Sequence, residues 1–219
     1  MCRKYRITKS ADEIEQRFEA AVDREYYRPN ANASTGQDLP VILDFNPHVV
    51  TLFKWGLIPA WAKDPAIGRN LVNARVETLT EKPSFKHSVK YRRCIVPADG
   101  FYEWKSVGSR KQAYLITLKD ESLFSFAGLW AEWSAPDGSP VPTFTIITTA
   151  PNKFMEEIHD RMPVILARED EKKWLSKDCP VPEALQLLKQ YPGELLKAEP
   201  FSFARASEQQ VLTLKPGSA

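Results

Sequence analysis

Cysteine and histidine are scarce in this chain of 219 residues. The sequence holds three cysteines (Cys2, Cys94 and Cys179) and three histidines. An odd number of cysteines without a CxxC pair argues against a disulfide framework, and no histidine stands at metal-ligand spacing from another histidine or a cysteine. We therefore expect no metal and no other cofactor, so that any chemistry must come from the chain itself.

Long apolar runs and a large excess of charge are also missing. No stretch approaches the roughly 20 residues of a membrane helix, and the first residues (MCRKYRITKSADEIEQ) lack the apolar segment of a signal peptide. We expect a cytoplasmic monomer with no membrane partner. The net charge is only +2, so any binding to nucleic acid would depend on local basic patches.

Segments rich in β-forming residues dominate the middle of the chain, and helical patterns flank them. Strands are expected at residues 40–45, 49–55, 93–98, 101–105, 113–118, 123–130 and 143–149. Helices are expected at about residues 11–22, 71–79, 84–93, 169–175 and 182–190, a loop at 27–39, and a frayed tail from about residue 212. The pattern predicts an α+β fold, a single domain over residues 1–219 with a mixed or antiparallel, barrel-like sheet flanked by short helices.

Cys2 stands directly after the initiator methionine. Cells usually remove Met1 before a small residue, which would give Cys2 a free α-amine. An α-amine has a pKa of about 7.7–8.0 against about 10.4 for lysine, so a far larger share of it is unprotonated near neutral pH. With its thiol it forms a 1,2-aminothiol, which condenses with an aldehyde to an imine and then to a thiazolidine. The alternative is a small apolar residue that begins a strand.

Three further clusters place polar residues inside apolar segments. On a helix, Asn73 and Glu77 would share a face, although capping or a surface salt bridge explains such a pair equally well. Glu103 lies between Tyr102 and Trp104 on a predicted strand. Alternation places its side chain opposite those of Tyr102 and Trp104, and a carboxylate beside apolar rings would have a raised pKa suited to proton transfer; the alternative is a solvent-facing glutamate.

His159 is the centre of the last cluster, between charged residues and the apolar stretch 163–166. A lone histidine is usually structural, but this position is typical of the end of an element that lines a cleft. Histidine is also the side chain best suited to acid–base chemistry near neutral pH.

Together and in this order, these clusters resemble the SRAP (SOS response-associated peptidase) family of abasic-site crosslinking proteins. The matching segments are Cys2 after Met1 and residues 32–37 (NASTGQ), 55–61 (WGLIPAW), 73–78 (NARVET), 93–104 (RCIVPADGFYEW), 126–130 (FAGLW), 148–152 (TTAPN) and 159–163 (HDRMP). They extend from residue 2 to about residue 166. The resemblance implies the SRAP fold and single-stranded DNA containing abasic sites as the partner.

The resemblance also implies catalytic roles. Cys2 would form an imine and then a thiazolidine with the ring-opened aldehyde of an abasic deoxyribose, which protects the lesion in the DNA damage response. Asn73 would hydrogen-bond near Cys2, Glu103 would position the α-amine and shuttle protons, and His159 would act as general acid on the ring oxygen. The same lyase-like chemistry could remove Met1 by self-processing.

DNA-binding roles follow from the same resemblance. Arg75 and Arg161 would contact phosphates that flank the lesion, and Trp61 would stack on or wedge into the DNA. Arg3, Lys4 and Asn32 are further expected contacts, and the protein would associate with the nucleoid when bound to DNA. Family members usually carry Gly-Arg after the cysteine where this chain has Arg3-Lys4, which weakens the phosphate contact expected at residue 4.

Two matters stay open at this stage. The basic run Lys86, Lys90, Arg92 and Arg93 fits a solvated helix face, and it also fits an extension of the DNA path. The function has two alternatives, an N-terminal-nucleophile cysteine peptidase whose oxyanion hole includes Asn73 or a backbone amide, and a non-covalent single-stranded DNA binding module in which Cys2 is incidental.

Overall fold

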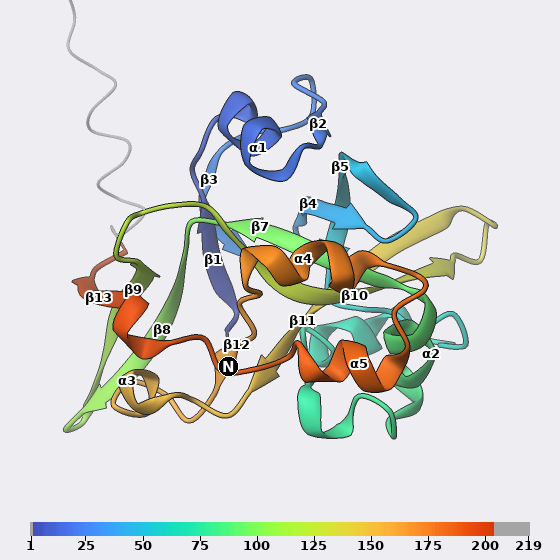
Figure 1. The fold of residues 1–219 in the computed structure, drawn as a ribbon. Helices are drawn as coiled ribbons and strands as arrows, with labels where there is room; N and C mark the ends of the chain where they lie inside the picture. Colours follow the sequence, from blue (N-terminus) through green and yellow to red (C-terminus); the bar gives the residue numbers. More distant parts are fainter. Residues whose placement is uncertain (1, 204–219) are drawn as a thin grey trace, which may run out of the picture.

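The computed structural model describes residues 2–203, which form a β-rich body with short helices around it (Figure 1). The strands are β1 (Lys4–Ile7), β2 (Ala21–Val22), β3 (Asn30–Ser34), β4 (Asp38–Leu43), β5 (Asn46–Trp55), β6 (Asn73–Arg75), β7 (Arg93–Ala98), β8 (Gly100–Val107), β9 (Arg110–Leu118), β10 (Phe124–Ser134), β11 (Pro140–Thr149), β12 (Met162–Pro163) and β13 (Leu196–Phe201). The α-helices are α1 (Ala11–Phe18), α2 (Pro83–Tyr91), α3 (Lys153–Glu156), α4 (Arg168–Leu175) and α5 (Val181–Gln186). The 3₁₀ helices are η1 (Pro65–Asn70), η2 (Val76–Thr78) and η3 (Gly193–Leu195).

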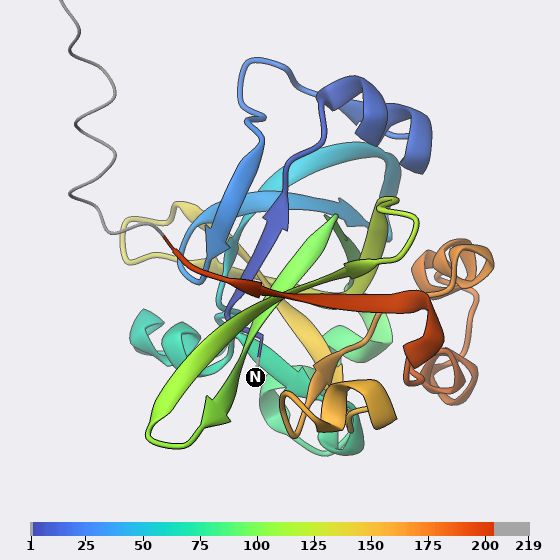
Figure 2. The ribbon, with the colours of Figure 1, turned by 90° about the vertical axis from the view of Figure 1, so that its left-hand side faces the viewer.

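Five of these strands close into a barrel. Antiparallel pairing joins β11, β10, β7, β4 and β5 in that order, and a parallel pairing of β5 with β11 closes the ring at Lys54–Thr143 and Trp55–Phe144. A second sheet, in the order β13, β9, β8, β1 and β3, lies against it (Figure 2). The predicted α+β fold with a mixed, barrel-like sheet is therefore confirmed.

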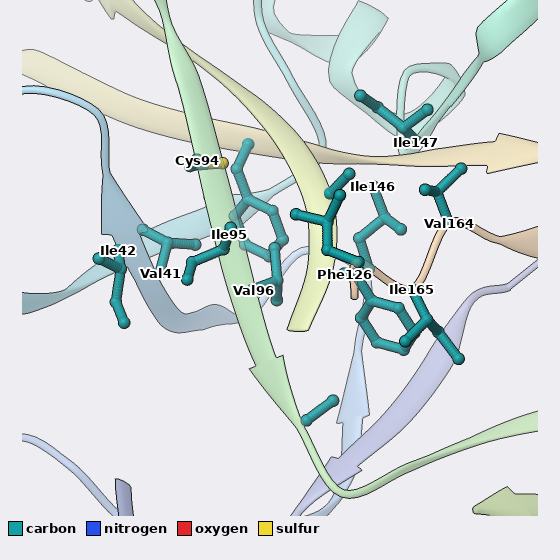
Figure 3. Packing of buried hydrophobic residues seen from close by; sticks show 14 of the residues in the cluster. Val41, Ile42, Cys94, Ile95, Val96, Phe126, Ile146, Ile147, Val164 and Ile165 are labelled. Atoms are coloured by element: carbon teal, nitrogen blue, oxygen red, sulfur yellow. The ribbon is translucent and has the colours of Figure 1, made fainter. Parts of the chain in front are cut away.

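The core consists of side chains that point inward from the barrel and from the second sheet. Figure 3 shows residues of β4, β7, β10 and β11 gathered with Val164 and Ile165, which follow β12. Cys94 is fully buried among them. Deeply buried side chains leave a core little freedom to shift, so the strands that carry the site are held in fixed positions.

Strand β1 is anchored at both ends of its short length. The ring of Tyr5 packs between Trp55 (centroids 5.4 Å apart) and Phe126 (5.9 Å). Asp99, at the junction of β7 and β8, accepts a hydrogen bond from the Thr8 backbone N–H at 2.8 Å and lies 3.0 Å from Nε of Arg6. These contacts fix the strand that follows Cys2.

Two predicted boundaries near the N-terminus are wrong. The helix predicted to reach residue 22 ends at Phe18, because Glu19 adopts a left-handed conformation (φ 55°) and Ala21–Val22 pair with β5 instead. The predicted loop at 27–39 contains β3, whose polar residues form an edge strand on β1. Pairing with a distant strand stabilises both segments in spite of their local propensity.

The segment 71–79 is the largest departure from the predicted structure. It was expected to be helical, but Asn73–Arg75 form β6, which pairs in parallel with Ile146–Thr148 of β11, and only Val76–Thr78 make a 3₁₀ turn. Asn73 and Glu77 therefore do not share a helix face. The neighbouring prediction holds, since α2 spans Pro83–Tyr91 with Pro83 at its first position.

The predicted frayed tail from about residue 212 lies outside the described residues. Within residues 2–203, no helix is both long and apolar enough to cross a membrane.

Replacing Asp99 by alanine should lower the free energy of unfolding by about 2–4 kcal/mol, because Arg6 and the Thr8 N–H would lose a buried partner. The matched control is Asp38→Ala, which removes an exposed ion pair with Lys54 and should cost less than about 1 kcal/mol. Urea unfolding of the two variants measures both values. Equal losses would contradict the anchoring role of Asp99.

Candidate functional site

Cys2 lies just before β1 and is almost completely buried. Its carbonyl oxygen accepts a hydrogen bond of 2.8 Å from Nδ2 of Asn73, and its thiol lies 3.6 Å from the carbonyl oxygen of Lys4. The pairing of β6 with β11 places Asn73 at this point. The two residues are 71 positions apart, so this contact depends on the whole barrel.

The side-chain oxygen of Asn73 can accept a further hydrogen bond. Its Oδ1 atom is buried, and it has no hydrogen-bond partner among the described residues. Since a buried polar atom without a partner is costly, this oxygen is suited to an N–H or O–H group that arrives with a substrate or forms at the start of the chain.

Glu103 and His159 form the acid–base part of the site. The Oε2 atom of Glu103 lies 3.7 Å from Nε2 of His159, and the Glu103 side chain is only 2% exposed. Its neighbours Tyr102 and Trp104 both contact Phe203, with ring centroids 4.9 Å and 6.1 Å away. The predicted alternation along this strand is confirmed, and the solvent-facing alternative for Glu103 is wrong.

Burial sets the protonation states of these two side chains. It raises the pKa of Glu103 from 4.5 to about 7, and it lowers the pKa of His159 below its usual 6.5. At neutral pH the carboxyl group is present both with and without its proton, while the imidazole is mainly neutral. The carboxyl group of Glu103 can therefore both donate and accept a proton near pH 7.

Two contacts of Nδ1 bear on which ring nitrogen of His159 carries the proton. The backbone N–H of Arg161, 3.0 Å from Nδ1, favours a neutral ring with its hydrogen on Nε2, the atom that faces Glu103. The exposed carboxylate of Asp160 lies 2.8 Å from Nδ1, where it can accept a hydrogen bond once the ring is protonated.

The thiol of Cys2 is held in its neutral form. Burial, and then the nearby carboxylate of Glu103, raise its pKa well above the usual value. A neutral thiol is a weak nucleophile until a base removes its proton.

An open cleft of about 1010 Å³ gives access to the Glu103–His159 pair. Arg3, Lys105 and Lys111 contribute positive charge to its lining. Residues at and after α3 contribute negative charge: Glu156, Glu157 and Asp160. Of these charged residues only Arg3 was predicted from the sequence, because the register of the β8–β9 hairpin, which brings Lys111 opposite Ser106, has no local signal.

The expected DNA-binding residues fall into separate groups. Lys4 donates from Nζ to Oδ1 of Asn32 at 2.7 Å, so this predicted pair meets in the structure. Arg161 forms a two-pronged ion pair with Glu77, at 2.6 Å and 3.0 Å, a contact that sequence analysis missed. Arg75 is exposed at the end of β6.

Trp61 lies apart from this cleft. It is 57% exposed, next to a small buried group formed by Ile58, Ala62 and Trp133. Exposure of so large an aromatic surface fits the predicted stacking role, which remains a prediction. Among residues 2–203, no three His, Cys, Asp or Glu side chains are grouped as metal ligands.

These features define one class of protein. They are a closed five-strand barrel, a buried cysteine near the start of the chain, an asparagine hydrogen-bonded to that cysteine, and a Glu–His pair. Residues 1–204 match the family model described as SOS response associated peptidase (SRAP), and the chain belongs to this family. The expected family membership is confirmed.

Relatives named as abasic site processing proteins occur in bacteria, in a bacteriophage and in vertebrates. The chain is 44% identical over 203 residues to the abasic site processing protein YoqW of Bacillus subtilis, which covers 90% of this chain and 91% of that protein. It is 35% identical over 213 residues to the abasic site processing protein HMCES of Xenopus tropicalis, covering 82% of this chain and 63% of that protein. Among solved structures, a protein from Bacteroides thetaiotaomicron has a TM-score of 0.86 and 32% identity, with 95% of this chain and 94% of that chain covered.

Replacing Glu103 by glutamine should stabilise the protein at pH 8 and not at pH 4.5. Between pH 4.5 and about pH 7 the folded protein keeps a proton that the unfolded chain has lost, so the stability supplied by this carboxyl falls as pH rises through that window. The difference between variant and wild type should grow to at most about 3 kcal/mol. Thermal melting across this range measures it.

The control is Glu77→Gln, for which the opposite sign is expected. Hydrogen bonding to Arg161 lowers the pKa of Glu77, so its carboxylate adds stability at neutral pH that is lost as pH falls through the folded-state pKa. A loss of stability in both variants at pH 8 would show that contacts of ionised Glu103 outweigh its burial.

Proposed function

We propose that this protein processes abasic sites in DNA by trapping them covalently on Cys2, preferably in single-stranded DNA. One observation carries the proposal. Cys2 is hydrogen-bonded to Asn73, and it lies near the Glu103–His159 pair, which lines a charged cleft. The names of the relatives YoqW and HMCES support the same substrate. Single-stranded DNA leaves the lesion accessible without base flipping.

The reaction begins with a free α-amine on Cys2, after hydrolysis of the Met1–Cys2 peptide bond. Met1 is removed by a cellular aminopeptidase or by the site itself. The freed amine would carry N–H groups within the region where Oδ1 of Asn73 has no partner among the described residues. Asn73 then holds both the carbonyl oxygen and the amine of the same residue.

The first covalent step is an imine condensation. The closed sugar of an abasic site opens to an aldehyde when its ring oxygen receives a proton and its 1-hydroxyl loses one. The amine of Cys2 attacks the aldehyde carbon, and the resulting carbinolamine loses one water molecule. Protonated Glu103 and the Nε2–H of His159 supply the acid, and ionised Glu103 supplies the base. A pKa of about 7 for Glu103 keeps both of its forms available.

The second step closes the ring. The sulfur of Cys2 adds to the imine carbon, its proton passes through Glu103 to the nitrogen, and a five-membered thiazolidine results without loss of any group. The raised pKa of the thiol keeps sulfur protonated until the imine has formed. The order of events is therefore amine first and thiol second.

Phosphate contacts would hold the strand in place without reading its sequence. Arg75 is exposed two residues after Asn73, and Arg161 follows His159 by two residues. Arg161 is occupied by Glu77 in this structure, so a phosphate must share or replace that carboxylate. Arg3 extends the positive charge into the cleft.

Incubation with an oligonucleotide carrying one abasic site should give an adduct that survives denaturing electrophoresis. Cys2→Ala should abolish the adduct, and Cys2→Ser should give a less durable one, because oxygen closes the ring less readily than sulfur. Intact mass spectrometry of the protein before the reaction reports whether Met1 is absent.

The control for Cys2 is Cys94→Ala, since Cys94 is a buried cysteine of the barrel core and its loss should leave the adduct chemistry intact. No adduct at any pH from about 6 to 8, in protein that lacks Met1, would overturn the proposal. Peptide cleavage in trans would favour a cysteine peptidase, and DNA binding indifferent to Cys2 would favour a non-covalent binding module.

Replacing His159 by alanine should slow adduct formation by about 10²–10⁴-fold, the usual contribution of a general acid. Affinity for undamaged single-stranded DNA should change much less, because the imidazole is mainly neutral and contributes little to phosphate binding. Single-turnover kinetics and fluorescence anisotropy separate the two effects. The exposed His48 supplies the control His48→Ala, and equal losses of rate and affinity in His159→Ala would indicate a structural histidine.

A further inference from the structure

Helix α2 carries a stripe of lysines on its solvent side. Lys82, at the N-cap, is followed by Lys86 and Lys90 at intervals of four residues, and all three are exposed. Residues four apart lie on the same face of a helix and rise about 6 Å along its axis. The opposite face packs Phe85 and Val89 into the core.

Among the described residues, no carboxylate lies within ion-pair distance of these three lysines. By contrast, Lys9, Lys54 and Lys197 each lie within 3.5 Å of a carboxylate. The positive charge of α2 is therefore available to a ligand.

This arrangement does not serve the helix itself. Like charges four residues apart repel one another, and a cation at the N-terminus opposes the helix dipole. The first turn of α2 contains no acidic residue, and Lys82 makes no side-chain capping bond. A binding role explains a charge pattern that is unfavourable for folding.

Aromatic rings extend the basic stripe. Tyr91 is 54% exposed, its ring centroid lies 5.1 Å from that of His87, and Nζ of Lys90 lies 4.8 Å from it. The guanidinium of Arg92 stacks over Trp130 at 4.8 Å. Basic groups interleaved with exposed rings are typical of surfaces that bind single-stranded nucleic acid. Arg93 does not belong to this surface, because it is buried.

The stripe follows Asn73 and Arg75 along the chain, after the short helix η2. Arg75, which is exposed at the end of β6, is followed by η2, and residues 79–82 then lead into α2. Figures 1 and 2 both place α2 in the same lower half of the molecule as the start of the described chain. A strand held at Arg75 can therefore continue toward Lys82.

We propose that the α2 surface, defined as Lys82, Lys86, His87, Lys90 and Tyr91, binds the sugar–phosphate backbone of the single strand that flanks the lesion. The inference rests on the proposed function only in that the ligand is DNA. The lysines neutralise phosphates at successive positions, and Tyr91 stacks on an adjacent base. The surface adds affinity and leaves the covalent step unchanged.

The test measures non-covalent binding in a Cys2→Ala background, so that its outcome does not depend on adduct formation. The variant is Lys82→Gln/Lys86→Gln/Lys90→Gln. The probes are a long undamaged single-stranded oligonucleotide and a short one that fills only the cleft, each titrated over a range of salt. The expected result is that the plot of log affinity against log salt for the long probe becomes shallower by about 2, because each single-strand phosphate contact contributes about 0.7. Binding of the short probe stays unchanged.

Two control variants test whether loss of positive charge elsewhere, or disruption of α2, could produce the same result. Lys9→Gln/Lys119→Gln/Lys197→Gln removes the same charge near Glu121, at the other end of β1 from Cys2, and should leave the salt dependence intact. The variant with arginine at residues 82, 86 and 90 keeps the charge and should bind as the wild type does, which also controls for folding of α2. An unchanged slope, an equal change for both probes, or the same change in the Glu121-side variant would overturn the proposal.

Discussion

The hydrogen bond between Asn73 and Cys2 is the contact on which the site depends. It joins two short segments that no local interaction could bring together, and both are held by non-local pairing. Strand β6 is placed by β11, and β1 is placed by Tyr5 in the core and by Asp99. Once Met1 is removed, as the proposed function requires, Cys2 would have one covalent tether, and its position would come from the packing around it.

The same non-local pairing explains what could be predicted from the sequence. The barrel strands were predictable because each carries its own alternating or apolar pattern, and Glu103 was placed correctly because alternation is a local rule. The structure of residues 71–79 could not be predicted, because a parallel strand of three residues leaves no periodic signal. This strand forms only because β11 offers an open edge. For the same reason Glu77 was assigned to Asn73, although its partner is Arg161, 84 residues away.

Burial of Glu103 illustrates how stability and chemistry oppose each other in this site. An ionised carboxyl in apolar surroundings is unfavourable, which is why its pKa rises to about 7. A solvent-facing carboxyl would be more stable at neutral pH, but it would be almost entirely ionised and could not donate a proton. The sequence predicted the direction of this effect from the neighbouring rings, but both rings pack on Phe203 at the other face of β8, and the shift comes from burial of the carboxyl in the folded protein.

A net charge of +2 is compatible with binding a polyanion because the charges are unevenly distributed. Acidic side chains neutralise lysines and arginines over much of the surface, as Glu171 does for Arg17 and Glu183 for Lys173. Within the described residues, the lysines of α2 lack such partners. What matters to an approaching phosphate is the local field within about 10 Å, the distance over which salt screens a charge. Net composition does not resolve charge at this scale, so the ion pairs formed in the folded protein determine where a polyanion could bind.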